Sequence, residues 1–509
     1  MIGAPIRRQG PAEGAGTIAD RSRPGRAAYS FAPLDVPETS VADGDRRHSA
    51  PDLPEVSEVD LVRHYTRLSQ MNHGLDTGFY PLGSCTMKYN PKVAETVAAL
   101  PGFQRLHPLQ PDRTVQGALE LLWRLEQALC EITGMARATL QPPAGACGEM
   151  TGLLIMRAYH ADRSGARTKV IIPDSAHGTN PASVRLAGFQ AVPVPSDARG
   201  LVDVSALGKL VDDEVAGLML TNPNTLGLFE KEIEEISRIV HDVGGLVYYD
   251  GANLNAILGR CRPGDMGFDI VHINTHKTFA TPHGGGGPGA GPVGVVDKLV
   301  PYLPSPLVER DEATGELRWD NERPRSIGRL HGFNGNIAVL VRAYAYVFLH
   351  GADGLKAVSE LAVLNANYLA ALVAEEFPLA FPDGRSMHEF VVTASHLKEA
   401  TGVRAMDVAK RLIDLGYHPP TVYFPLVVEE AMMIEPTETE TKETLDAFAG
   451  ALRRAASEAR TDPDLLHEAP VSTPVRRLDE ARAARHLKLR WGADEGRGSP
   501  GPLVPGKVT

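Results

Sequence analysis

The sequence predicts an α/β protein with a large domain on a mostly parallel β-sheet and a smaller α/β domain after it. Between about residues 135 and 300, short apolar segments alternate with segments whose apolar residues recur at helical spacing, as expected of strands joined by helical crossovers. The apolar segments lack strict polar alternation, which is typical of strands buried on both faces. From about 350 to 460, the strand segments have more antiparallel potential.

The composition excludes several classes of function. The 509 residues contain 43% hydrophobic and 23% charged residues, the balance of an ordinary globular protein. The net charge of −11 argues against a general nucleic-acid or anionic-membrane surface. No apolar run approaches the roughly 20 residues of a membrane span. We therefore expect neither a nucleic acid nor a membrane as partner.

The predicted location is the cytoplasm. The four cysteines show no CxxC pair, which indicates free thiols in a reducing compartment. The N-terminal MIGAPIRRQGPAEGAG has two arginines but no apolar core behind them, unlike a secretory signal.

The first part of the chain contains few elements. Residues 1–50 are rich in Gly, Pro, Ala, Arg and Asp and predict an extended or partly disordered arm. Apolar positions recur at helical spacing in residues 54–72. An irregular loop is predicted for residues 78–92, and an amphipathic helix closed by Gly134 is predicted for residues 115–134.

The alternating region then supplies the predicted sheet. Strands are expected within the segments 137–148, 168–189, 190–197, 215–230, 245–253 and 269–277, with helices within 149–163, 168–189 and 232–244. A long helix begins in 333–351, strands follow in 387–395 and 422–438, and the end of the chain is predicted to be loosely ordered. The predicted domains are an arm (1–50), a helical and loop region (51–134), a large domain (135–345), a small domain (346–461) and a tail (462–509).

Candidate functional residues lie at the ends of the predicted strands. In an open parallel sheet, ligands bind outside the carboxyl ends of the strands. The segments expected there are 144–148, 174–180 with His177, 222–225, Asp250 and 275–277. They could converge on one cleft.

Lys277 and Asp250 form the most informative pair. An amine in a partly desolvated site has a lowered pKa and can act as a Schiff-base nucleophile. Asp250 ends the preceding strand, 27 residues before Lys277, and an aspartate there could pair with the protonated pyridine nitrogen of pyridoxal phosphate. The alternatives are a solvated lysine and an acid that caps a helix or turn.

Several neighbouring residues could complete a cofactor site. The His177 ring could stack on a flat cofactor or bond the backbone of its own loop. The segment PPAGACGEM at 142–150 is a glycine-rich turn opening a helix, and its free N–H groups suit a phosphate. Thr225 and Thr275 could donate hydroxyl groups or be plain turn residues.

The glycine run and the histidines do not predict a nucleotide or metal site. Gly284 to Gly287 are not followed by the Lys-Ser/Thr of a phosphate loop or by a helix. We therefore interpret them as residues that let the backbone approach closely beside the active site. His272 and His276, on a predicted strand, would be roughly 13 Å apart, too far to share an ion. No metal site is expected.

Long motifs resemble a known family, glycine dehydrogenase (decarboxylating), the P-protein of the glycine cleavage system, in subunit 2 of its two-subunit form. The motifs are GFYPLGSCTMKYNPK (78–92), LQPPAGACGEMTGLL (140–154), PDSAHGTNPAS (173–183), THKTFATPHGGGGPG (275–289), SIGRLHGFNGN (326–336), HPPTVYFPLVVEEAMMIEPTETETKETLD (418–446) and RLDEARAARHLKLRW (477–491). The resemblance spans about residues 22–491. Cys147 stands where the family pattern leads us to expect His or a similar residue.

The resemblance implies an aspartate-aminotransferase-like (fold type I) pyridoxal-phosphate-dependent transferase, with 135–345 as the cofactor-binding domain. It implies that Lys277 carries pyridoxal 5'-phosphate as an internal aldimine, with Asp250 at the pyridine nitrogen and His177 against the ring. Lys277 and His177 are the expected catalytic residues. Further cofactor-binding residues are expected at Ala146, Cys147, Thr225, Thr275 and Ala252.

The resemblance also implies an activity and partners. The expected reaction is decarboxylation of glycine, with release of CO2 and transfer of the aminomethyl group to the oxidised lipoyl arm of H-protein. A chain of this length would be one half of the single-chain form, so a related subunit 1 is implied as partner, with two copies of each. A channel for the lipoyl arm, lined by the 78–92 loop, is a hypothesis that substitution of Ser84, Met87 and Asn90 would test.

Three other functions stay open at this point. Another pyridoxal-phosphate enzyme would need a carboxylate-binding arginine, for which Arg329 is available in an aminotransferase, or a mobile cysteine, for which Cys85 is available in a cysteine desulfurase. A non-catalytic partner subunit would have no chemical reason to keep Lys277 with Asp250. A metal hydrolase would bind metal and be colourless.

Overall fold

The computed structural model describes residues 16–37, 39–49, 51, 53–107, 110–163, 165, 167–283, 289–487 and 489. Its contacts divide the chain into two units, Leu75–Ala469, and Met1–Gly74 together with Pro470–Thr509. The predicted domain boundaries stay predictions. The tetraglycine run, 284–287, lies outside the described residues.

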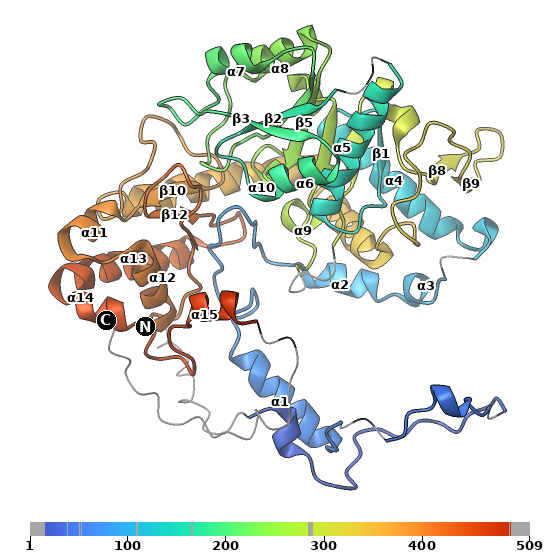
Figure 1. The fold of residues 1–509 in the computed structure, drawn as a ribbon, viewed down its shortest axis with the longest axis horizontal. Coiled ribbons are helices and arrows are strands. Elements are labelled where there is room, and N and C mark those ends of the chain that lie inside the picture. The colour runs from blue at the N-terminus through green and yellow to red at the C-terminus, as the bar shows by residue number, and fades with distance from the viewer. Residues whose placement is uncertain are drawn as a thin grey trace. The chain divides into compact units, whose positions relative to one another are not determined.

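A seven-stranded sheet organises the larger unit (Figure 1). Its strand order is β1-β7-β6-β5-β4-β2-β3. The strands are β1 (Arg137–Thr139), β2 (Lys169–Pro173), β3 (Gln190–Val194), β4 (Val215–Thr221), β5 (Leu246–Gly251), β6 (Ile270–Ile273) and β7 (Val293–Val295). Strands β2 to β6 pair in parallel, whereas β7 runs antiparallel to both β6 and β1. The predicted mostly parallel sheet is confirmed.

Helices cover both faces of this sheet, as the apolar strand segments predicted. Alternate strand residues belong to separate cores because successive side chains point to opposite faces. Ile171 and Val247 pack in the core that includes α4 (Gln116–Thr133) and α8 (Ile233–Asp242), whereas Val170 and Tyr248 pack with α5 (Gly145–Ala161) and α6 (Thr179–Leu186).

Short elements connect and extend these layers, including 3-10 helices, which are labelled η. They are α2 (Lys92–Ala98), α3 (Pro101–Gln104), η3 (Asp112–Thr114), α7 (Val204–Leu210), η4 (Leu254–Ala256), η5 (Pro263–Met266), α9 (Thr275–Thr278), η7 (Asp297–Tyr302), β8 (Leu307–Arg310) and β9 (Leu317–Asp320). Helix α4 ends as predicted at Gly134, whose φ of 73° is readily adopted only without a side chain.

A second, antiparallel sheet follows the long helix α10 (Ile337–Val373). Its order is β10-β12-β11, formed by Phe390–Thr393, Ala431–Ile434 and Thr421–Val422. Helices α11 (Ser395–Thr401), α12 (Ala405–Asp414), α13 (Lys442–Thr461) and α14 (Pro463–Glu468) accompany it. The antiparallel potential predicted for this region is confirmed.

Two predicted element boundaries are wrong. Helix α5 starts at Gly145, four residues before the predicted segment that begins at Glu149, because the glycine-rich turn is itself helical. The segment 275–277 is not strand: β6 ends at Ile273 and the one-turn helix α9 follows.

The other unit contains η1 (Ile18–Arg21), η2 (Asp43–Asp45), α1 (Glu58–Gln70) and α15 (Glu480–Arg485). Helix α1 was predicted, and its start is fixed by Ser57, whose side chain accepts a hydrogen bond from the Asp60 amide at 3.2 Å. Across the described ranges, we find no helix with the length and apolar character that a bilayer span requires.

Candidate active site

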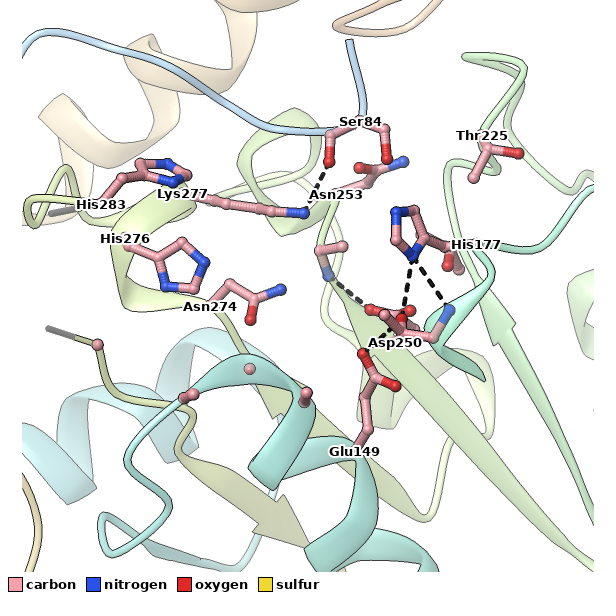
Figure 2. Close-up of a pocket in the computed structure, with 17 residues that line it drawn as sticks. Ser84, Glu149, His177, Thr225, Asp250, Asn253, Asn274, His276, Lys277 and His283 are labelled. Atoms are coloured by element: carbon pink, nitrogen blue, oxygen red, sulfur yellow. Dashed lines mark hydrogen bonds between the residues drawn. The ribbon is translucent and has the colours of Figure 1, made fainter. Parts of the chain in front are cut away.

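A cavity of about 300 Å³ lies at the carboxyl ends of the parallel strands (Figure 2). Its wall includes His177 after β2, Thr221 and Thr225 at and after β4, Asp250 at the end of β5, and Lys277 after β6. The strand ends therefore meet at one site, as the parallel topology predicted.

Lys277 reaches into the cavity from α9. Its Nζ donates a hydrogen bond to the backbone carbonyl of Ser84 at 2.8 Å, and Figure 2 shows the side chain extended toward that residue. The contact joins the 78–92 loop to the lysine. The one-turn helix after β6, rather than a continued strand, carries the amine across the strand ends.

Asp250 is a buried, ionised carboxylate at the floor of the site. It is 2% exposed, and its Oδ1 accepts a hydrogen bond from the Ala252 amide at 3.0 Å. Burial alone would raise its pKa, but His272, 3.2 Å away, and Lys277 oppose that effect and hold the Asp250 pKa below its usual value. The site thus keeps a fixed negative charge away from water.

Glu149 is a second buried carboxyl group, and sequence reasoning missed it. Its oxygens accept hydrogen bonds from Thr179 Oγ1 at 3.0 Å and Ser183 Oγ at 2.8 Å. Burial, and next the charge of Asp250, raise the Glu149 pKa to about 7. The sequence signal that could have identified Glu149 was its position in the first turns of a helix that follows a strand end.

His177 lies on the loop between β2 and α6. Its Nδ1 is 3.0 Å from Thr179 Oγ1, and the residue lines the cavity while it is also exposed to solvent. Partial burial, followed by the charge of Lys277, lowers the His177 pKa. A neutral ring is therefore presented to the cavity, and stacking on a cofactor stays a prediction.

The other predicted cofactor residues divide into two groups. Ala146, Thr225 and Ala252 line the cavity. The Thr225 hydroxyl is already engaged, since it donates to the Ser175 carbonyl.

Thr275 and Cys147 are not among the residues that line the cavity. Thr275 is fully buried and donates to the Ala290 carbonyl at 3.1 Å. Cys147 is partly exposed in the first turn of α5. Their roles in cofactor binding stay predictions.

The N-terminus of α5 forms part of the cavity wall. Ala144 is the N-cap, and it lines the cavity together with Gly145 and Ala146. A Cβ on Gly145 would lie 1.9 Å from Asn274 Oδ1, and one on Gly291 would lie 2.2 Å from the Ala144 carbonyl oxygen. Glycine at both positions therefore lets the backbone close around the helix end, where unpaired N–H groups favour an anion.

His272, His276 and His283 lie near the site but do not form one group. His272 faces Asp250, while His276 and His283 pack edge to face with ring centroids 4.8 Å apart. The expected strand separation of His272 and His276 does not apply, because His276 lies on α9. Burial first, and nearby positive charge second, lower the pKa of His276 to about 3 and that of His283 to about 4.

Among the residues that the structure describes, two buried groups of side chains have possible metal-ligand atoms within 4.8 Å of one another, Glu149–Asp250–His272 and His388–Glu389–Glu435. The charge of Lys277 acts on the titratable side chains of both groups. That ammonium opposes a further cation at either place.

Curated relatives match nearly the whole chain. A protein of Caldanaerobacter subterraneus subsp. tengcongensis is 60% identical over 480 residues, covering 93% of this chain and 98% of that protein. One from Bacillus licheniformis is 58% identical with the same coverage. Both are named "Probable glycine dehydrogenase (decarboxylating) subunit 2". The chain belongs to the glycine dehydrogenase (decarboxylating) subunit 2 family.

Two family models match parts of the chain, and solved structures share its fold. Residues 358–468 match "Glycine dehydrogenase, C-terminal domain", and residues 147–286 match "Aminotransferase class-V". An inhibitor-bound glycine decarboxylase (P-protein) of the glycine cleavage system is 22% identical, with a TM-score of 0.67 over 80% of this chain and 92% of that one.

A cysteine desulfurase from Thermococcus onnurineus shares the same fold. It is 13% identical, with a TM-score of 0.59 over 75% of this chain and 95% of that one. The predicted aspartate-aminotransferase-like, fold type I class is confirmed for this subunit 2 family member.

Proposed function

We propose that this chain is the cofactor-bearing subunit of a pyridoxal-phosphate-dependent glycine decarboxylase. It decarboxylates glycine, releases CO2 and passes the aminomethyl group to the oxidised lipoyl arm of H-protein. The observation that carries this proposal is one cavity holding both the amine of Lys277 and the buried, ionised Asp250, in a chain 60% identical to a named subunit 2 over almost its full length.

The residues present fit pyridoxal 5'-phosphate. The cavity supplies a primary amine at Lys277, a carboxylate at Asp250, a neutral imidazole at His177 and the glycine-lined N-terminus of α5. These match the aldehyde, the pyridine nitrogen, the ring face and the phosphate. When bound, the cofactor supplies an electron sink for the bond between the glycine Cα and its carboxylate.

The side chains of this protein then divide the remaining tasks. Asp250 provides negative charge where a protonated ring nitrogen would lie. Lys277 Nζ, anchored on the Ser84 carbonyl at 2.8 Å, is placed to hold a proton or return it to the substrate carbon.

Glu149 adjusts the charge at the floor of the site. With a pKa of about 7, its carboxyl group is about half protonated in neutral solution and largely protonated in slightly acidic solution. It therefore adds less negative charge beside Asp250 than an ordinary glutamate would. This leaves the site able to accept an anionic substrate.

The naming of the relatives supports a two-subunit assembly, and the finer partners are part of the proposal. We infer a separate subunit 1, with two copies of each chain, and a lipoylated H-protein as the acceptor of the aminomethyl group. The described cysteines are free thiols, in keeping with a cytoplasmic location.

The 78–92 loop is the proposed wall of a lipoyl channel. Ser84 lines the cavity, and Asn90 Nδ2 donates to the Ala280 carbonyl at 2.8 Å, close after Lys277. The channel proposal predicts that substitution of Ser84, Met87 and Asn90 slows turnover with H-protein. Unchanged glycine exchange and unchanged H-protein turnover would reject it.

Two alternative enzymes find less support at this site. Arg329 is exposed, donates hydrogen bonds to Asn334 and Asn321, and is not among the residues that line the cavity, so its position does not support the role of an aminotransferase arginine. Cys85 lies near the site, with Sγ 3.8 Å from His283 Nδ1, but burial raises the pKa of its thiol. A protonated thiol is a poor nucleophile for desulfuration.

The first test is the visible spectrum of the chain purified with its subunit 1, before and after borohydride reduction, followed by peptide mapping. We expect a cofactor band, and a pyridoxyl group fixed on Lys277. Lys277→Ala should abolish the adduct, whereas Lys92→Ala, at an exposed lysine paired with Asp76, should retain it. Wild-type protein that forms no adduct with cofactor supplied would reject the catalytic role.

The reaction itself requires a second measurement. Glycine should exchange its carboxyl carbon with labelled bicarbonate, and H-protein should accept the aminomethyl group only when its lipoyl arm is oxidised. Conversion of cysteine to alanine, with sulfide released by an added thiol reductant and with no glycine exchange, would instead identify a desulfurase.

A further inference from the structure

Glu389 is a fully buried carboxyl group that the proposed reaction does not use. It lies immediately before β10, in the part of the chain that follows α10. Its Oε2 accepts a hydrogen bond from the Ser84 amide at 2.7 Å, and its Oε1 accepts one from Asn253 Nδ2 at 3.2 Å. Both of its hydrogen-bond partners line the active-site cavity.

Ser84 connects this carboxyl group to Lys277. While its amide donates to Glu389, its carbonyl accepts from Lys277 Nζ at 2.8 Å. Ser84 has a φ of 64°, a left-handed conformation that residues with a side chain seldom adopt without local support. The bond to Glu389 supplies that support.

The surroundings of Glu389 indicate which carboxyl group in the area carries charge. Glu435 and His388 are fully buried, and their carboxylate and ring atoms make no well-formed hydrogen bond. Burial, and next the charge of Glu389, raise the Glu435 pKa, while the Thr86 hydroxyl and Lys277 favour its ionised form more weakly.

Burial lowers the pKa of His388 to about 3, with Lys277 and Lys88 adding to the effect. His388 is therefore neutral. Burial raises the pKa of Glu389 to about 7, while the hydrogen bond from Ser84, the charge of Lys277 and the hydrogen bond from Asn253 favour its ionised form. Glu389 is therefore the member of the cluster best able to ionise as the pH rises through about 7.

From this geometry we propose that Glu389 is a positioning residue for Lys277. It fixes the left-handed Ser84 backbone and, when ionised, places a negative charge behind the carbonyl that holds the lysine nitrogen. The proton on that nitrogen is stabilised as a result. The inference rests on the proposed role of Lys277 as cofactor carrier.

The test is a pH titration of the visible spectrum of the cofactor-loaded protein, purified with its subunit 1. In Glu389→Gln, the midpoint of the cofactor band should move to lower pH by about half a unit to one unit, because an opposite charge near the nitrogen is lost. Cofactor content and the Lys277 adduct should remain. The control is Glu430→Gln, at a buried carboxyl group that accepts from the Ala405 amide outside the cavity, and it should leave the midpoint unchanged.

A second pair of variants tests the backbone without altering Glu389. Ser84→Gly retains the N–H, the carbonyl and access to positive φ, whereas Ser84→Val disfavours that conformation. The midpoint should therefore move further in Ser84→Val than in Ser84→Gly.

The failures of the two proposals are distinguishable. Wild-type protein without a pyridoxyl adduct on Lys277 rejects the proposed function. An adduct with the wild-type midpoint in Glu389→Gln, or with equal midpoints in both Ser84 variants, rejects the positioning role alone.

Discussion

Asp250 and Glu149 are two buried carboxyl groups that the site holds in different protonation states. The Asp250 pKa lies below its usual range because His272 and Lys277 outweigh the effect of burial, whereas burial and Asp250 itself raise the Glu149 pKa to about 7. If both were ionised, the Glu149 and Asp250 carboxylates, whose oxygens lie within 4.8 Å of each other, would repel strongly in a buried site. Asp250 therefore carries a fixed negative charge, whereas Glu149 can bind or release a proton near neutral pH.

The charge of Asp250 should be essential to the rate. Asp250→Asn retains the shape of the side chain but removes the charge that supports a protonated ring nitrogen, so we expect glycine decarboxylation to fall by about 10²- to 10³-fold. The Lys277 adduct should still form. Asp174→Asn, at a strand-end acid that bonds Ser196 and lies outside the cavity wall, should change the rate little. Equal rates in wild type and Asp250→Asn would contradict this role.

Glu149 should make stability depend on pH. Its folded-state pKa of about 7 lies above the usual value of 4.5, so its contribution is fully present below about pH 4.5 and is lost as pH rises through about 7. Glu149→Gln cannot ionise, and its stability relative to wild type should increase over this interval by about 3 kcal/mol at most.

Denaturant unfolding of both proteins at several pH values measures this difference. A constant difference between wild type and Glu149→Gln across the interval would contradict the raised pKa. The exposed Glu235→Gln provides a control on the same sheet domain.

At the scale of elements, the start of α5 shows how backbone packing makes an anion site. The helix begins within the glycine-rich turn, and Gly145 leaves no room for a side chain because Asn274 Oδ1 occupies the place of its Cβ. The strand β6 and the helix N-terminus can therefore approach closely. The unpaired N–H groups of the first turn remain available to a phosphate.

Gly145→Ala should weaken cofactor binding. Its Cβ would lie 1.9 Å from Asn274 Oδ1, so the helix start or Asn274 must move. We expect the affinity for pyridoxal phosphate to fall by about tenfold or more, corresponding to about 1.4 kcal/mol. Cofactor titration of the apoprotein measures it. Gly178→Ala, where the Cβ would meet nothing within 4 Å, is the matched control, and equal loss in both variants would contradict a specific effect at α5.

The sequence could predict the elements with strong local patterns. Helix α4 with Gly134, the buried strands and the strand-end position of Lys277 all follow from spacing within a few residues. The three-residue antiparallel strand β7 has no such signal and depends on pairing with β1 and β6. The helical start of α5 was missed because glycine is a poor helix former.

The candidate site was predictable only in part. Lys277, Asp250 and His177 lie at or within a few residues of the carboxyl ends of strands, where topology brings them together. Glu389 was not predicted because its partner Ser84 is 305 positions away. No local pattern encodes a contact of that range.

At the scale of the Leu75–Ala469 unit, the 78–92 loop links the three-stranded sheet to the segment that follows α9. Leu82 forms a bridge with Ile434 beside the small sheet, and Asn90 bonds Ala280 close to the active-site lysine. Between them Lys88 is 1% exposed and donates to Asn255 Oδ1 at 2.7 Å and Glu438 Oε1 at 2.8 Å. A buried ion pair thus fastens the loop.

Loss of this ion pair should destabilise the whole unit. Lys88→Met leaves the buried Glu438 carboxylate without its partner, so we expect a loss of about 3–5 kcal/mol in the free energy of unfolding. The double variant Lys88→Met/Glu438→Gln should recover part of it. Lys92→Ala, at the exposed pair with Asp76, should lose less than about 1 kcal/mol. Denaturant titration compares them, and similar losses for Lys88→Met and Lys92→Ala would contradict the structural role of Lys88.

The Lys88–Glu438 contact also has a consequence for synthesis of the chain. Its two residues are separated by 350 positions, so a ribosome releases the loop long before its partner exists. Domains generally fold as they emerge, and the sheet carrying Lys277 can form while the loop is still unanchored. We therefore expect a nascent chain to gain a reactive lysine before it gains a finished pocket, with cofactor capture as a late, post-translational event.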